Sequence, residues 1–336
     1  MGKDKISGDL GGGGQLSYDF VKEIILPAFN NPYLDRLDDG AVFDINGVRL
    51  AFSTDTFVAD PIFFPGGSIG DLAVNGTVND ISMCGAKPLY ISAGLIIEEG
   101  FPENDLKIIL KDMAESADMA NVKIVTGDTK VVPKGAVDKI FINSSGIGIV
   151  SENITVSCSN AKPGDKIILS GTIGDHGIAM LTQREAMAFE TEIKSDTASL
   201  CSMVENILSF GRDIHVLRDP TRGGVGTVLN EIALMSGAGI FFYEEKIPVK
   251  KEVAGICEIL GLDPLYIANE GKLIAVAAPA AALDILKSIR NDPLGCDAAI
   301  IGEVVSDFSG QVIMETGIGG KRIVDMLKGE QLPRIC

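Results

Sequence analysis

The sequence has no tryptophan, and aromatic residues make up only 6% of its 336 residues, so its cores should consist mainly of aliphatic side chains. It also has no block of basic residues, and 46 acidic against 29 basic side chains give a formal net charge of −17. A chain with this charge is not expected to bind nucleic acid. Because no run approaches the roughly 18 apolar residues that a membrane-spanning helix needs, we expect no membrane partner either.

Two further absences concern the cysteines and the start of the chain. The six cysteines are scattered without a CxxC pair, which argues against a zinc site or a disulfide framework. The first residues contain lysines and glycines and do not form the apolar run of a secretion signal. We therefore expect free thiols in a cytoplasmic, reducing compartment. Cys84, Cys201 and Cys257 fall in apolar helical patterns and are expected to be small core residues.

One cysteine, Cys336, is the last residue of the sequence. Gly329 provides a hinge and Pro333 stiffens the backbone just before the end. We predict that residues 329–336 form a mobile tail with a reach on the order of 25 Å. Its thiol could then visit a partner protein and a cleft in the body of the same chain. The alternative is a frayed end that carries a cysteine by chance.

A glycine-rich stretch lies near the N-terminus, just before an apolar-periodic helix predicted over 18–29. Backbone N–H groups in such a stretch can approach an anion closely, and a helix N-terminus adds a positive dipole. The alternative is a flexible arm. The sequence contains no GxxxxGK[ST] motif, so this is not a P-loop. The glycines of the candidate anion site are Gly11, Gly12, Gly13 and Gly14.

Four aspartates are predicted at the ends of elements in the first half of the chain: Asp38, Asp55, Asp80 and Asp128. Isolated aspartates at such places are usually caps or turn formers. Four of them beside an anion site instead suggest Mg²⁺, which prefers oxygen ligands and is often shared between carboxylates and phosphates. We predict these four as the metal ligands. Among the elements around them, the pattern predicts a helix over 70–84, which also carries Asn79 on the face of Asp71 and Asn75. It predicts strands over 89–97, 122–126 and 139–150, the last broken at 144–146, and a helix over 102–119.

The second half begins after a turn-rich linker, residues 160–165, and again alternates strands and helices. Asp219-Pro220-Thr221-Arg222-Gly223 opens a helix over 225–236 and is a second candidate anion site. Asn269-Glu270 lies directly before an apolar strand, 273–277. The pattern predicts two α/β (or α+β) domains without a Rossmann fingerprint. The other expected elements are a strand over 166–170, a helix that follows 171–177 and runs to about Ala188, helices over 195–210, 249–260, 279–290 and 321–328, and a strand pair near 298–314.

Several motifs resemble the ATP-binding PurM-like (aminoimidazole ribonucleotide synthetase) superfamily: Ser53-Thr54-Asp55, Val78-Asn79-Asp80 and Thr126-Gly127-Asp128-Thr129. Within it, the chain resembles the HypE family of hydrogenase maturation factors, the carbamoyl dehydratases. The resemblance covers nearly the whole chain. It implies a two-domain PurM-like fold with residues 1–36 as glycine-rich segment and helix, 37–158 as ATP-binding and dimerising domain, 159–328 as C-terminal domain and 329–336 as tail. The motifs specific to the family are Phe64-Pro65-Gly66-Gly67, Asp219-Pro220-Thr221-Arg222, Ala268-Asn269-Glu270-Gly271-Lys272 and Pro333-Arg334-Ile335-Cys336.

The resemblance implies an ATP-dependent reaction on the terminal cysteine. A carbamoyltransferase, HypF, places a carbamoyl group on the Cys336 sulfur, and the tail then folds into the chain's own cleft. Phosphorylation by ATP turns the carbamoyl oxygen into a leaving group, and loss of phosphate and protons leaves a thiocyanate. The HypC–HypD scaffold complex accepts the cyanide for the iron of [NiFe] hydrogenase. The resemblance also implies ATP and Mg²⁺ as cofactors and a homodimer.

Roles for individual residues follow from this chemistry. Glu270 is the expected base, with Asn269 as its orienting amide; a plain turn charge is the alternative. His176 is a second possible base, although a lone histidine is more often structural. Lys134 could contact phosphate or the reacting oxygen, and Arg334 could offset the charge of the chain end; each could equally be a solvated charge. The expected nucleotide-binding residues are the four glycines with Asp38, Asp55, Asn79, Asp80, Asp128, Thr129, Lys130, Asp219, Arg222, Gly223 and Asn269.

One departure from the family pattern lies in the glycine-rich stretch. The family usually has His-Gly-x-Gly-Gly there, whereas this sequence has Leu10 before the glycines. Any role of that histidine must be filled by another group. Two other functions remain open at this point. A kinase or ligase for a free small molecule would not need the tail cysteine, and a non-catalytic scaffold would not need the aspartates.

Overall fold

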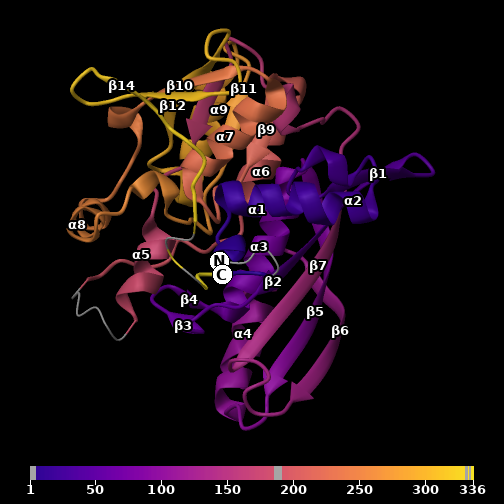
Figure 1. Cartoon of the computed structure of the whole chain (residues 1–336). Helices are drawn as coiled ribbons and strands as arrows, with labels where there is room; N and C mark the ends of the chain where they lie inside the picture. The colour runs from indigo at the N-terminus through magenta and orange to yellow at the C-terminus, as the bar shows by residue number, and fades with distance from the viewer. Residues whose placement is uncertain (1–4, 185–190, 330–331, 333) are drawn as a thin grey trace.

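A computed structural model describes residues 5–184, 191–329, 332 and 334–336. Its described part contains a five-stranded sheet, a seven-stranded sheet and a two-stranded hairpin, with helices packed on the two larger sheets (Figure 1). Mixed α/β layers of this kind confirm the predicted fold class. In the same described part, no helix is both long enough and apolar enough to cross a membrane.

The first sheet has the strand order β1-β2-β7-β5-β6. Only β5 and β6 run parallel; the other neighbours are antiparallel. Helices α3 and α4 cover one face, where they lie beside the long strands in Figure 1. The elements of this half are β1 (Ala41–Ile45), β2 (Val48–Phe57), β3 (Phe63–Phe64), β4 (Gly67–Ser68), α3 (Ile69–Met83), β5 (Ala86–Glu98), α4 (Glu103–Met119), β6 (Lys123–Val132) and β7 (Ile140–Val150).

Helix α3 is the central element of the first half, and its start is fixed by a capping box. The Ser68 hydroxyl accepts from the Gly70 N–H at 3.1 Å, and the Asp71 carboxylate accepts from the Ser68 N–H at 2.7 Å. Such a cap satisfies N–H groups that have no partner within the helix. Nearly every residue of α3 is buried, because the helix lies between the first sheet and the second half of the chain.

The second sheet has the strand order β14-β13-β10-β12-β8-β11-β9. Its core is aliphatic, as the composition predicted, with isoleucine, leucine and valine from β8, β9, β11 and the flanking helices. The elements are β8 (Lys166–Leu169), α5 (Asp175–Thr182), α6 (Cys201–Leu208), β9 (Ile214–Arg218), α7 (Gly224–Ser236), β10 (Gly239–Tyr243), α8 (Lys251–Leu260), β11 (Ile274–Ala277), α9 (Ala282–Arg290), β12 (Ala299–Val305), β13 (Val312–Glu315) and β14 (Lys321–Ile323).

The N-terminal segment forms a helix earlier than predicted. Helix α1 (Gly14–Phe20) starts four residues before the expected start at Tyr18 and continues through a π-helical turn (Val21–Ile25) into α2 (Leu26–Phe29). Gly13 and Gly14 both have a φ of 76°. A Cβ on Gly14 would lie 2.2 Å from the Leu327 carbonyl oxygen, so the close contact to the end of the chain requires glycine there.

Several predicted boundaries are wrong for physical reasons. Strand β6 runs on through Gly127 to Val132 because it pairs with β5 along its whole length. Strand β7 is unbroken at 144–146, where the small residues fit beneath α3. The predicted last helix, 321–328, begins instead as β14, which folds back on β13 through the turn at Thr316–Gly320. Strands β12 and β13 do not pair; both pair with β10.

Two other predictions concern the helices of the second half. The predicted helix over 195–210 is confined to α6, whereas α7, α8 and α9 occur near where they were expected. The helix expected after Gly177 begins slightly earlier, as α5, and its predicted end at Ala188 lies outside the described residues, as does Pro333.

Candidate functional site

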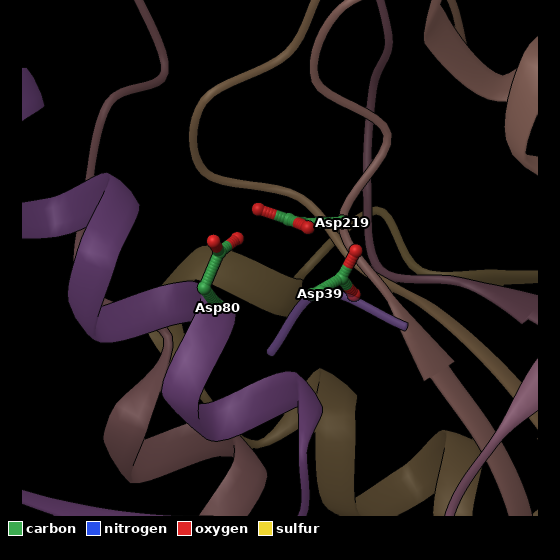
Figure 2. Close-up of side chains that lie close together, drawn as sticks. All are labelled: Asp39, Asp80 and Asp219. Carbon is green, nitrogen blue, oxygen red and sulfur yellow. The ribbon is translucent and has the colours of Figure 1, made fainter. Parts of the chain in front are cut away.

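Three carboxylates converge where the two halves of the chain meet. Asp39 precedes β1, Asp80 lies on α3 and Asp219 follows β9, and one oxygen from each lies within 4.8 Å of the others (Figure 2). This is the one group of three or more potential ligands found among the described residues. We call it the acidic cluster.

Polar neighbours hold the members of the acidic cluster in place. The Arg218 Nε lies 2.8 Å from Asp39 Oδ1, and its Nη2 lies 2.6 Å from Glu231. The Ser53 hydroxyl donates to Asp80 Oδ2 at 2.7 Å. Asp55 is next to the cluster, because alternate residues of β2 point toward α3. There it accepts from the Thr77 hydroxyl at 3.1 Å.

The carboxyls of this region hold their protons unusually well. Burial raises the pKa of Asp39 and of Asp80 well above the usual range, and for Asp80 the nearby carboxylates of Asp55 and Asp219 add to the rise. Burial also raises the pKa of Asp219 to about 6, against the opposing effect of Arg218. Because repulsion between buried carboxylates causes part of this shift, a cation bound among them would reverse it.

A cavity of about 450 Å³ opens beside the acidic cluster. Its wall contains Gly13, Gly14 and Tyr18 from the N-terminal segment and Arg222 from the start of α7, together with all three cluster aspartates. The Arg222 Nη1 donates to the Gly11 carbonyl at 3.3 Å, which ties the glycine-rich stretch to the second candidate anion site. The two predicted anion sites thus form one cavity.

The C-terminal tail folds into the body of the chain. Leu332 and Ile335 are buried within the apolar cluster that includes Phe57 and Ile178. Two hydrogen bonds join the tail to the segment after β2. The Val58 N–H donates to a backbone oxygen of the terminal Cys336 and the Asp60 N–H to the Arg334 carbonyl, both at 3.0 Å. The chain end therefore lies in the middle of the molecule (Figure 1).

Arg334 anchors the tail. Its Nη1 lies 2.6 Å from Asp138 Oδ2 and its Nε donates to the Val58 carbonyl at 3.0 Å. Its backbone has a φ of 54°, the left-handed conformation that costs a residue with a side chain some strain. The side-chain contacts offset this strain and turn the last two residues inward. Asp138 lies in the turn between β6 and β7, which also carries the exposed Lys134.

Cys336 and Glu270 line the same small cavity. Its other walls include Asp55, Asp80, Asp219 and Arg222, so the chain end borders the acidic cluster. Glu270 is buried, and its Oε1 has no hydrogen-bond partner. Burial, with added repulsion from Asp219 and Asp196, raises the pKa of Glu270 well above its usual range. A carboxyl of this kind is well suited to accept a proton from a group placed beside it.

The other predicted polar residues have structural partners. The Asn269 side chain accepts from the Gly174 N–H at 2.8 Å and donates to the Pro220 carbonyl at 2.8 Å. The Asn79 side chain accepts from Leu200 N–H and donates to the carbonyls of Ala198 and Glu270. Both amides thus join loops around the site. Gly223 has a φ of 79° and precedes the first turn of α7.

Several predicted residues are not part of the acidic cluster. Asp38 accepts instead from the Ser157 hydroxyl at 3.1 Å and from the Cys158 N–H at 3.3 Å. Asp128 lies within β6 with its side chain 72% exposed, 3.6 Å from Lys130. Thr129 follows it in the same exposed strand. Asp55, Asp80 and Asp128 were predicted at the ends of elements, and this was wrong: they lie inside β2, α3 and β6.

The sequence reasoning chose Asp38 and not the adjacent Asp39 as a site residue, and it did not count Asp219 as a metal ligand. Asp39 stands beside Asp38 in the sequence. Which of the two carboxylates enters the cluster depends on the backbone conformation of the turn before β1, and the sequence pattern does not give that conformation. Asp219 was expected only to bind an anion, although its position directly after a buried strand resembles that of the other candidates. The role of Asp196, described below, carried no sequence signal.

Comparisons with known proteins define the class first. Models of the N-terminal and C-terminal domains of AIR synthase related proteins match residues 37–150 and 162–315. The chain is a two-domain AIR synthase related protein, and the predicted PurM-like superfamily is confirmed.

The relatives define the family within this class. The carbamoyl dehydratase HypE of Bradyrhizobium diazoefficiens is 52% identical over 97% of this chain and 94% of its own. A crystal structure of a HypE–HypF complex matches at 52% identity with a TM-score of 0.88, covering 92% of this chain and 99% of that one. HypE in complex with ATP matches at 50% identity and a TM-score of 0.83 over 99% and 100% of the two chains. The chain belongs to the HypE family of carbamoyl dehydratases.

Proposed function

We propose that this protein converts a carbamoyl group on its own Cys336 sulfur into a thiocyanate at the expense of ATP, in the maturation of [NiFe] hydrogenase. The observation that carries the proposal is the position of the tail, which puts Cys336 into one cavity with Glu270, Arg222 and the acidic cluster. A scaffold protein would not need its chain end there, and a kinase for a free small molecule would find this cavity filled by the protein's own residues.

The reaction balances without any oxidant or reductant. The carbamoyl oxygen takes the terminal phosphoryl group of ATP, and the C–O bond then breaks with release of phosphate. Two N–H protons leave, the carbon–nitrogen bond becomes triple, and the sulfur stays on carbon throughout. Glu270 would accept a proton from this nitrogen, because its buried carboxyl has a raised pKa and a free acceptor oxygen. Arg222 would hold phosphate oxygens at the start of α7.

The cavity of about 450 Å³ is the proposed ATP site, since the glycine-rich stretch and Arg222 both border it. The acidic cluster fits Mg²⁺, because it offers hard oxygen ligands whose mutual repulsion a cation relieves. Asp39, Asp80 and Asp219 would hold the ion, with Asp55 beside them. When bound, the ion would neutralise phosphate charge during transfer. Asp38 and Asp128 remain predicted ligands that this single chain does not bring to the cluster.

A second copy of the chain is the proposed cover for the bare face of the first sheet. On the face opposite α3, Phe52, Ile147 and Tyr90 are direct neighbours across three strands, and each is 36–45% exposed. A contiguous apolar row of this kind usually marks an interface. We expect Ile147→Glu to convert a dimer into a monomer in sedimentation analysis. An unchanged sedimentation coefficient would contradict this interface.

HypF is the proposed donor of the carbamoyl group, and a HypC–HypD complex is the proposed acceptor of the cyanide, in the cytoplasm. To reach these partners Cys336 must leave the cavity, so the tail has to alternate between an inner and an outer position. The acidic surface of the protein, with its net charge of −17, provides electrostatic guidance toward a partner with basic patches.

Mass spectrometry of the tail peptide tests the proposal. After carbamoylation by HypF and removal of the HypF reaction components, the peptide should carry a carbamoyl group, and the adduct should lose one water only when MgATP is added. Cys336→Ala should give no adduct while still binding ATP. An adduct that ATP leaves unchanged would support the scaffold function, and ATP consumption on a free small molecule without any adduct would support the kinase.

A further inference from the structure

Hydrogen bonds connect one short segment, Ser195–Thr197, to both reacting groups of the proposed dehydration, Cys336 and Glu270. The segment follows α5 and precedes α6. The segment is not in the family motifs that the sequence analysis used. It is tied to the first half of the chain, because the Ser195 N–H donates to the Pro65 carbonyl at 2.7 Å. It also lies against the Glu270 loop: a Cβ on Gly271 would come 1.8 Å from the Asp196 carbonyl oxygen.

The first connection runs from Ser195 through His176 to the tail. His176 Nε2 lies 2.7 Å from the Ile335 carbonyl oxygen, and its Nδ1 lies 2.8 Å from the Ser195 hydroxyl. Because a carbonyl only accepts, Nε2 must carry the proton, and Nδ1 of the neutral ring then accepts from Ser195. The Ser195 oxygen in turn accepts from the Thr197 N–H at 3.1 Å. The ring is fully buried and packs edge-on against Phe64.

This arrangement excludes His176 from the role of base. Both of its nitrogens are engaged, and burial lowers its pKa, so that it stays neutral. The contact that it makes instead is to the peptide bond directly before Cys336. A hydrogen bond at that carbonyl fixes the direction in which the last residue points.

The second connection runs from Asp196 to Glu270. Asp196 Oδ1 accepts from the Glu270 N–H at 3.1 Å, and Oδ2 lies 3.1 Å from the Lys272 Nζ. Asp196 and Lys272 are both buried, with side chains 5% and 9% exposed. Asp196 thus contacts the Glu270 backbone on one side of Gly271 and the Lys272 side chain on the other. A buried ion pair of this kind is weak evidence for a stabilising role, since well-packed apolar residues of similar volume often replace it at no cost.

We propose that the segment Ser195–Thr197 positions both reacting groups for dehydration, the Cys336 sulfur through His176 and the Glu270 carboxyl through Asp196. This inference rests on the proposed roles of Cys336 and Glu270. His176 and Asp196 are positioning residues, since neither lines the cavity that Cys336 and Glu270 share. One rigid segment would then set the distance between the carbamoyl nitrogen and the carboxyl that takes its proton.

Two matched pairs of variants in the full-length protein test the proposal. His176→Phe keeps the ring against Phe64 but removes the donor to Ile335, whereas His176→Gln keeps a donor. Asp196→Ala removes the acceptor for the Glu270 N–H, whereas Asp196→Asn keeps it and removes only the charge. Each protein is carbamoylated with HypF and then mixed with saturating MgATP, and the single-turnover rate of water loss is measured. The alkylation rate of unmodified Cys336 by iodoacetamide reports the position of the tail.

We expect His176→Phe to raise alkylation of Cys336 and to slow dehydration at least tenfold, and His176→Gln to restore both toward wild type. Asp196→Ala should slow dehydration at least tenfold while leaving alkylation unchanged, with partial recovery in Asp196→Asn. Wild-type dehydration in His176→Phe or in Asp196→Ala would overturn the proposal. Equal losses in both members of each pair would overturn it too, since that result indicates a general structural role.

Ser195→Ala provides a milder variant in case the others fold poorly, which their melting temperatures would reveal. It removes only the hydroxyl between His176 and the Thr197 N–H and should raise Cys336 alkylation while slowing dehydration severalfold. Unchanged values of both would contradict the proposal. The proposed function itself fails differently: the wild-type adduct would then lose no water at all with MgATP.

Discussion

Ile335 offers the most direct test of how the tail is held. Its side chain is 7% exposed and packs in the apolar cluster with Leu332. Ile335→Ala removes about three methylene-sized groups from this cluster, at ~0.8 kcal/mol each, or about 2.4 kcal/mol of docking free energy. Since about 1.4 kcal/mol corresponds to a factor of ten, the docking equilibrium should shift by about 50-fold toward the outer position.

The assay is the rate at which iodoacetamide alkylates Cys336, followed by mass spectrometry of the tail peptide. When opening and closing of the tail are fast, this rate follows the population of the open form. Cys296 is exposed in the same molecule and serves as the internal reference. A synthetic peptide of the last residues gives the upper limit. We expect Ile335→Ala to accelerate alkylation of Cys336 up to about 50-fold and to leave Cys296 unchanged.

Ile259→Ala is the matched control, because Ile259 is 72% exposed on α8 and the same change there removes no buried contact. If Ile335→Ala reacted no faster than this control, burial of Ile335 would not hold the tail. The position of Cys336 would then need another cause, such as the contact between Arg334 and Asp138.

Three further predictions concern the chemistry and its pH dependence. Asp80→Asn should abolish the stabilisation that Mg²⁺ gives the wild type in thermal melts and reduce turnover at least tenfold; equal Mg²⁺ stabilisation in the variant would exclude Asp80 as a ligand. Glu270→Gln should be carbamoylated normally and lose no water with MgATP, and normal dehydration would assign the base elsewhere. Burial lowers the pKa of His176 in the folded protein below its unfolded value near 6.5. The neutral ring therefore stabilises the fold fully above pH 6.5, and this contribution is lost as the pH falls from 6.5 toward the lower pKa of the folded state. The melting temperature should therefore drop more between pH 7.5 and pH 5.5 in wild type than in His176→Gln, and parallel curves would contradict this.

Much of the fold could be predicted from the sequence because its signals are local. Ser68 and Asp71 form their capping box within one turn, and the buried face of α4 follows a helical period. Errors arose where pairing with a distant segment decides the outcome. Gly127 and Ser144-Ser145 suggest breaks by composition, yet β5 and α3 keep these strands continuous.

The same limit explains the errors in the candidate site. Asp55 and Asp80 were selected as aspartates at the ends of elements; they lie inside β2 and α3 instead, but both line the cavity beside the cluster. Asp38 and Asp39 stand in a turn, where the choice depends on Arg218 from the second half of the chain and on Ser157 from the segment just before the linker. Asp219 lies across the domain boundary from the others. The contacts of His176 with Ile335 and Ser195 join segments up to 159 positions apart and leave no periodic signal.

The structure shows what surrounds the position at which this sequence lacks the family's histidine. Leu10, which stands where the family usually has histidine, lines the cavity beside the acidic cluster. An apolar side chain there cannot donate to a phosphate, so the anion must be bound by backbone N–H groups and by Arg222. The backbone around Gly11 is open, because a Cβ added there would meet no other atom within 4 Å. A Cβ added to Gly13 would instead come 2.9 Å from the Arg222 carbonyl oxygen, so glycine is needed for the close approach of these two segments. Leu10→His should therefore tighten ATP binding modestly without changing dehydration of the bound carbamoyl group, as titration calorimetry and single-turnover rates would show. A large gain in the dehydration rate would contradict this prediction. It would mean that a histidine at position 10 takes part in the chemistry and that the natural protein lacks this contribution.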